Sequence, residues 1–74
     1  MIRELDSIVL TEDLPEHGLK SGDIGTVVLV HRGGEGYEVE FVTLNGETVA
    51  VVSVISSHVR PIHKRELAHV RALA

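Results

Sequence analysis

The sequence of 74 residues contains no cysteine and no tryptophan, and its only aromatic residues are Tyr37 and Phe41. Without cysteine, neither a disulfide framework nor a thiolate metal site can stabilise so short a chain. A chain of this length forms one domain and buries only about 60% of its unfolded surface, so it relies on packing or assembly. With 43% hydrophobic residues, it nevertheless has the composition of a folded protein.

Long apolar runs are also missing from the sequence. No run approaches the roughly 20 residues needed to cross a bilayer. Arg3 and Glu4 place charges where a signal peptide would be apolar. We therefore expect a cytoplasmic protein that makes no contact with a membrane.

Patterns typical of catalysis or metal binding are scarce. His63 and His69 are six residues apart, so on a helix they face different ways, and the chain offers no cysteine to complete a zinc site. No serine lies in a nucleophile-elbow context. The glycines Gly33, Gly34 and Gly36 precede a predicted strand rather than a helix, which excludes a dinucleotide fingerprint. We expect no enzymatic activity, no cofactor and no metal ion; a small enzyme stays as a third alternative and requires a pocket with a perturbed carboxylate or histidine.

What the sequence does contain is a series of short, β-branched segments separated by turn residues. These segments predict strands over residues 6–10, 24–30, 37–42, 47–54 and 58–62. The continuously apolar run 24–30 is typical of a strand covered on both faces. The segment 37–42 alternates, with Tyr37, Val39 and Phe41 on one face and glutamates on the other. Four to five short strands in series predict a mainly β protein, a small antiparallel barrel.

Two connections between these strands carry specific expectations. The loop 11–23 is long, and we expect Leu14 and Leu19 to anchor it to the core. Asn45-Gly46 predicts a two-residue hairpin with a type I′ turn, which needs positive φ at both positions.

The last residues differ in character from the rest. Residues 63–74 consist of good helix formers, and Leu67, Val70 and Leu73 recur at helical spacing. We predict a barrel over 1–62 followed by a C-terminal α-helix over 63–74. Because so short a helix is marginal alone, it must dock. It closes the open end of its own barrel or, as the alternative, forms the contact of a homo-oligomer.

One set of motifs resembles a known family. The string Glu12 to Leu19 (EDLPEHGL), followed by Gly22, Gly25 to Val27 and Tyr37 to Phe41, resembles the small bacterial proteins called domain of unknown function 4926. The resemblance covers roughly residues 4–62 and excludes the basic tail. It implies an SH3-like barrel whose glycine–valine hairpin is similar to the KOW motif of ribosomal and transcription proteins. It implies no activity, and it suggests a genetically linked partner, as in toxin–antitoxin pairs.

The charge is distributed unevenly along the chain. Residues 1–57 carry ten acidic and three basic side chains, whereas residues 58–74 carry one acidic and four basic side chains. The acidic part disfavours phosphate backbones, whose neutralisation dominates nucleic-acid affinity. We therefore predict a non-enzymatic protein-interaction module. Its partner-binding residues are those of an acidic loop and of the tail stripe: Glu12, Asp13, Leu14, Pro15, Glu16, Leu67, Val70 and Leu73.

Nucleic-acid binding is the alternative function. A KOW-like module would contact RNA or DNA weakly through the basic tail, whose positive side chains are Arg60, Lys64, Arg65 and Arg71.

Overall fold

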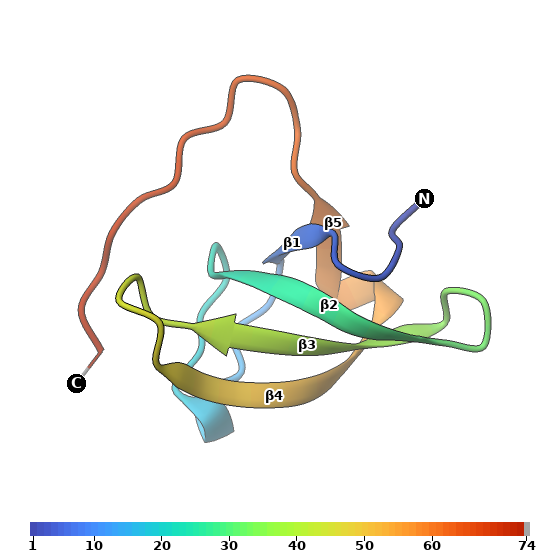
Figure 1. The fold of residues 1–74 in the computed structure, drawn as a ribbon, viewed down its shortest axis with the longest axis horizontal. Helices are drawn as coiled ribbons and strands as arrows, with labels where there is room; N and C mark the ends of the chain where they lie inside the picture. The colour runs from blue at the N-terminus through green and yellow to red at the C-terminus, as the bar shows by residue number, and fades with distance from the viewer. Residues whose placement is uncertain (74) are drawn as a thin grey trace.

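The protein folds into one antiparallel sheet of five strands (Figure 1). The structure is a computed structural model and describes residues 1–73. In chain order the elements are β1 (Ser7–Leu10), the 3-10 turn η1 (Pro15–His17), β2 (Ile24–His31), β3 (Gly36–Val42), β4 (Thr48–Ile55), the 3-10 turn η2 (Ser56–His58) and β5 (Val59–Pro61). Their order in the sheet is β4-β3-β2-β1-β5, which confirms the mainly β prediction.

The core lies on one face of this strongly curved sheet. Tyr37, Val39 and Phe41 of β3 are at most 5% exposed, as their alternation predicts. The other members of the buried cluster come from every remaining strand and from the long loop: Ile8, Leu10, Leu19, Val27, Val52, Val54 and Val59. Because no core residue among residues 1–73 lies beyond Val59, we expect the sheet to fold without the tail.

The long loop between β1 and β2 is anchored as expected. Leu14 and Leu19 pair in an isolated antiparallel bridge, and each donates its amide to the other's carbonyl, at 2.9 and 3.1 Å. Leu19 is 3% exposed, and Leu14 packs against the core from its edge. A stretch of this length stays ordered because two apolar side chains fix its base.

The β2–β3 hairpin is present, but one expectation for β2 is wrong. Ile24, Val28 and Leu29 are each more than 40% exposed, so this strand is covered on one face only. The register shifts between Val27 and Leu29, which places Leu29 beside Glu38 on the outer face. The continuous apolar run therefore reflects a bulged strand with an apolar outer side rather than a strand buried on both sides.

The β3–β4 turn also differs from the expectation. Gly46 has φ +94°, but Asn45 is not among the residues with positive φ, which excludes a type I′ turn. Gly46 donates to the Thr43 carbonyl (3.0 Å), and Thr43 donates to the Glu47 carbonyl (2.8 Å). This is a three-residue hairpin loop, a type I turn closed by a left-handed glycine.

The predicted C-terminal helix is absent. Residues 62–73 contain no helix or strand, and Arg65 has φ +63°, which interrupts any helical course. A helix this short needs a docking surface, and Leu67 is instead 96% exposed. Ala74, the last residue of the predicted helix, lies outside the described residues. Among residues 1–73 the only helical elements are two 3-10 turns, and no helix there is long and apolar enough to cross a bilayer.

The tail follows a long detour instead. Figure 1 shows it leaving β5, arching away from the sheet and returning beside the β3–β4 turn. Its return brings the C-terminal residues next to the loop that precedes β2, far from where the tail began.

Candidate functional site

The acidic loop holds its carboxylates in solvent on a fixed backbone. Glu12, Asp13 and Glu16 are all exposed. Asp13 accepts a hydrogen bond from the Ser21 amide (2.8 Å), which ties the two halves of the loop together. Pro15, also exposed, begins η1, where its missing amide proton costs nothing. Of the predicted loop residues, only Leu14 turns inward.

The tail residues of the predicted site are not brought into one stripe. Leu67 and Val70 are 96% and 71% exposed and contact no buried cluster. Leu73 is 46% exposed and lies at the groove described below. Without a helix the three side chains have no common face, so the stripe predicted for partner binding does not exist in this structure.

Arg71 joins the tail to the loop before β2. Its Nε donates to Asp23 Oδ1 (2.8 Å), and its Nη2 donates to Asp23 Oδ2 (2.5 Å). The same Nη2 donates to the carbonyl of Gly18 (3.1 Å). The Arg71 guanidinium lowers the pKa of the Asp23 carboxyl from its usual 3.8, and the Lys20 amide that Asp23 accepts acts in the same direction. Sequence reasoning missed Asp23; the opposite charges of body and tail were the only signal for this contact.

A groove of about 550 Å³ lies between the returning tail and the sheet. The tail supplies one wall with residues 68–73. The body supplies an apolar wall from the loop before β2, the ends of β2 and β3, the β3–β4 turn and β4: Leu19, Ile24, Phe41, Val42, Leu44 and Val49. Asp23 lies at this groove together with its partner Arg71. The groove therefore combines an apolar surface with two carboxylates, Asp23 and Glu47.

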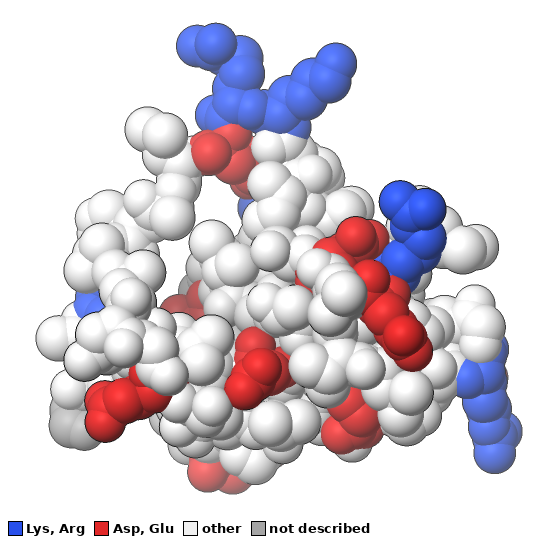
Figure 2. Space-filling model, viewed as in Figure 1, with Lys and Arg blue, Asp and Glu red and all other residues white. Residues whose placement is uncertain are grey.

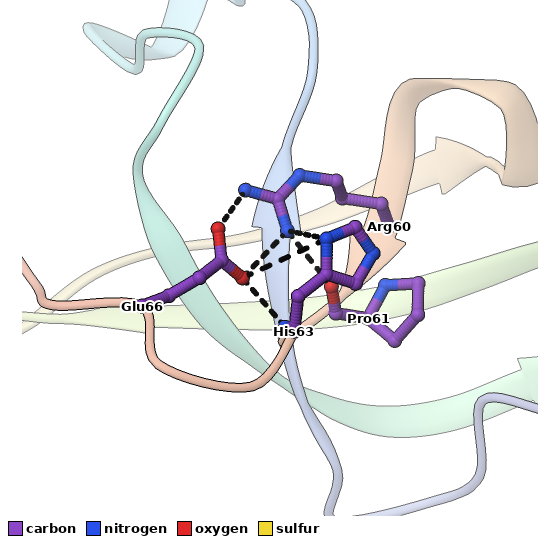
Figure 3. Close-up of polar contacts among 4 residues, drawn as sticks. All are labelled: Arg60, Pro61, His63 and Glu66. Atoms are coloured by element: carbon purple, nitrogen blue, oxygen red, sulfur yellow. Dashed lines mark hydrogen bonds and ion pairs between the residues drawn. The ribbon is translucent and has the colours of Figure 1, made fainter.

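A second ion pair shapes the start of the tail (Figure 3). Arg60 donates to both carboxylate oxygens of Glu66, at 2.9 and 2.6 Å, and Glu66 also accepts the His63 amide. The Arg60 guanidinium and then the His63 amide lower the pKa of Glu66 to about 2. These interactions fold residues 60–66 into a closed bend. They also engage Arg60, one of the four basic residues predicted to contact nucleic acid in the alternative function.

The outer face of the sheet carries a small polar cluster. Glu38 on β3 accepts from Ser53 on β4 and contacts His31 Nε2 on β2 at 2.7 Å. The Ser53 hydroxyl and then His31 lower the pKa of Glu38. The hydroxyl donates to the carboxylate rather than to the imidazole. This cluster depends on the register of three strands, which the sequence does not reveal.

Charge is segregated on the molecular surface. Figure 2 shows most Asp and Glu across the middle and lower part of one face and Lys and Arg projecting at its rim, with an acidic group also beneath the basic side chains at the top. Within residues 1–73, no group of three or more His, Asp or Glu side chains is arranged to hold a metal ion.

Comparison with known proteins gives a family and no function. No curated protein and no solved structure matches the chain. The model of one family, described as Domain of unknown function (DUF4926), matches residues 4–61, from the segment before β1 to the end of β5. The match includes the acidic loop and Asp23 and leaves out the tail. The chain belongs to this DUF4926 family.

Proposed function

We propose that the protein is a non-enzymatic, SH3-like interaction module whose acidic loop receives a basic segment of a partner protein. One observation carries the proposal: the chain's own Arg71 already binds beside this loop, at Asp23 and the Gly18 carbonyl. A rigid loop with exposed carboxylates suits a basic partner, because charge complementarity speeds association and excludes wrong partners.

The strand arrangement supports the SH3-like assignment. β1 pairs with β2 along one side and with β5 along the other, so the first and last strands are neighbours. β4 and β5 lie at the two ends of the strand order, so within the described residues each has one unpaired edge. Such an edge would give a partner a second, backbone-mediated contact.

The test uses charge reversal at Glu12 and Glu16. Asp13 is left unchanged because it supports the loop through Ser21. The double variant Glu12→Lys/Glu16→Lys is expected to lose most recovery of a partner in affinity purification from the native host. The purified partner should then bind the wild-type protein in calorimetry and bind the variant at least about tenfold more weakly.

A matched control separates local from overall charge. Glu4→Lys/Glu35→Lys changes the net charge equally at two exposed sites outside the loop. This variant should retain the partner. Equal binding by wild type and by Glu12→Lys/Glu16→Lys would remove the loop from the interface.

Nucleic-acid binding stays as the second candidate because two basic side chains of the tail are unengaged. Arg60 and Arg71 are held by Glu66 and Asp23, whereas Lys64 and Arg65 form no ion pair within residues 1–73. The candidate predicts that a fluorescent single-stranded RNA binds at low salt and is released steeply as salt rises. Lys64→Ala/Arg65→Ala should abolish that binding, and no change in anisotropy at low salt would eliminate this function.

A further inference from the structure

Arg71 alone fastens the tail to the body. Among residues 63–73, it is the one residue whose side chain hydrogen-bonds to a residue before Arg60, and no backbone hydrogen bond joins the two parts of the described chain. The other ion pair, Arg60 with Glu66, is local to the bend that follows β5. The attachment is thus a single side chain at the end of a ten-residue detour.

The groove beside Arg71 is only partly filled by the tail. Every residue from Pro61 to Leu73 is exposed, including those that line the groove. Leu73 remains 46% exposed next to a volume of about 550 Å³. A well-packed internal segment leaves no such space, because protein interiors are close-packed. The tail therefore lies against the groove without sealing it.

We propose that this groove binds a peptide segment of a partner protein in which arginine is followed two residues later by an aliphatic side chain. The chain's own Arg71-Ala72-Leu73 occupies the site as a displaceable internal ligand. This inference rests on the proposed function and names the chemistry of the basic partner.

The carboxylate of Asp23 is prepared for a guanidinium. Its Oδ2 accepts the Lys20 amide (2.8 Å), which fixes the side chain, and both oxygens face Arg71. Gly18 ends η1 in a left-handed backbone conformation, and its carbonyl accepts a further N–H from Arg71 Nη2. Two parallel bonds to a carboxylate and a third to a carbonyl match the planar fork of arginine and not the point charge of lysine.

The apolar wall provides the second half of the recognition. Ile24, Val42 and Leu44 are 42%, 45% and 89% exposed, although each is a large aliphatic side chain. They line the same groove as Asp23 and Leu73. An aliphatic side chain two residues after arginine would cover this surface and remove it from water.

The internal tail lowers the apparent affinity for any external peptide. A tethered segment competes at a high effective concentration, which is millimolar for a short flexible connection. Only a fraction of the protein molecules then has an open site. The apparent dissociation constant of the external peptide is its intrinsic value divided by that fraction. Releasing the tail should therefore strengthen binding without any new contact.

The experiment uses a fluorescein-labelled peptide with the sequence of residues 66–74 (ELAHVRALA) and full-length proteins. Arg71→Ala protein, whose tail is released, should bind this peptide about tenfold more tightly than the wild type. Asp23→Asn introduced into Arg71→Ala should weaken binding about tenfold. Peptides with lysine in place of the arginine, or alanine in place of the leucine, should bind more weakly and test the site on an unchanged, folded protein.

Three results would overturn the inference. The first is that the Arg71→Ala protein shows no saturable binding of the peptide. The second is that the arginine and lysine peptides bind equally. The third is that two wild-type copies exchange their tails, which would be seen as a dimer that dissociates when the peptide is added. The Glu12→Lys/Glu16→Lys protein should bind the peptide with the affinity of the wild type, apart from the change that the matched charge control Glu4→Lys/Glu35→Lys also shows. A partner that depends on Glu12 and Glu16 while the peptide does not bind would contradict this inference and leave the acidic-loop proposal standing.

Discussion

At the scale of single residues, the interactions that define the site are between side chains far apart in the sequence. Arg71 meets Asp23 across 48 positions, and Ser53 meets Glu38 across 15. Ordinary surface ion pairs contribute little to stability, about 0–1 kcal/mol. Their role here is to determine where the tail runs and which charges remain available to a partner.

Glu66 should titrate far below an ordinary glutamate. In an NMR titration of its carboxyl carbon, we expect a pKa of about 2 in the wild type and a return toward 4.5 in Arg60→Gln. Because the folded-state pKa is depressed, the stabilisation from this pair is complete above about pH 4.5 and is lost as the pH falls toward 2. A wild-type pKa near 4.5 for Glu66 would exclude the bend drawn in Figure 3.

Gly25 is required by the close packing of β2 against β3. A Cβ at this position would lie 2.5 Å from Val39 Cγ1 and 2.8 Å from Phe41 Cε1, both in the core. Gly25→Ala should lower the free energy of unfolding by about 1–3 kcal/mol, measured by urea denaturation. Ser57→Ala, on the exposed turn η2, should change it by less than about 0.5 kcal/mol. Two equal values would show that the core relaxes around the added methyl.

At the scale of elements, local pattern was reliable where local chemistry decides the structure. The alternation of Tyr37–Phe41 gave the correct buried face, and Leu14 and Leu19 anchor the loop as predicted. The patterns misled where two local solutions exist. Asn45-Gly46 is compatible with a two-residue and with a three-residue hairpin loop. The structure has the three-residue loop, and the β-bulge at Phe41/Val42 accompanies it.

The acidic loop should depend on its single fully buried anchor. Leu19→Ala removes a side chain that is 3% exposed, and we expect a loss of about 2–3 kcal/mol in unfolding free energy. Amide hydrogen exchange in residues 12–20 should accelerate more than in β3. Leu67→Ala is the matched control, since Leu67 is 96% exposed and should change stability by less than about 0.5 kcal/mol. Unchanged exchange in the loop of Leu19→Ala would show that other contacts hold it.

At the scale of the whole molecule, the fold and the tail are energetically separate. The buried hydrophobic residues of the described range 1–73 lie between Ile8 and Val59, and the family match ends at residue 61. The tail adds one ion pair to the body, Arg71 with Asp23, and its bend holds the contacts of Glu66 with Arg60 and His63. It therefore governs access to the groove and contributes little to the stability of the sheet.

Removing residues 63–74 should leave the sheet folded. We expect the unfolding free energy to fall by no more than about 1 kcal/mol, because only partly exposed ion pairs are lost. Removing residues 59–74 should instead prevent folding, since it deletes β5 and the buried Val59. Circular dichroism with thermal denaturation distinguishes the two truncations. Unfolding of the shorter deletion would show that the tail belongs to the folding unit.

The sequence by itself determined the mainly β class, the buried face of β3, the anchored acidic loop and the family, because each depends on residue types at short spacing. Only the tertiary structure decided the course of the tail, the one-sided cover of β2 and the grouping of Ser53, Glu38 and His31. The helix predicted for residues 63–74 failed for the same reason. Its propensity is local, whereas a short helix persists only if the rest of the fold offers a surface to receive it. This fold presents Asp23 to Arg71 instead.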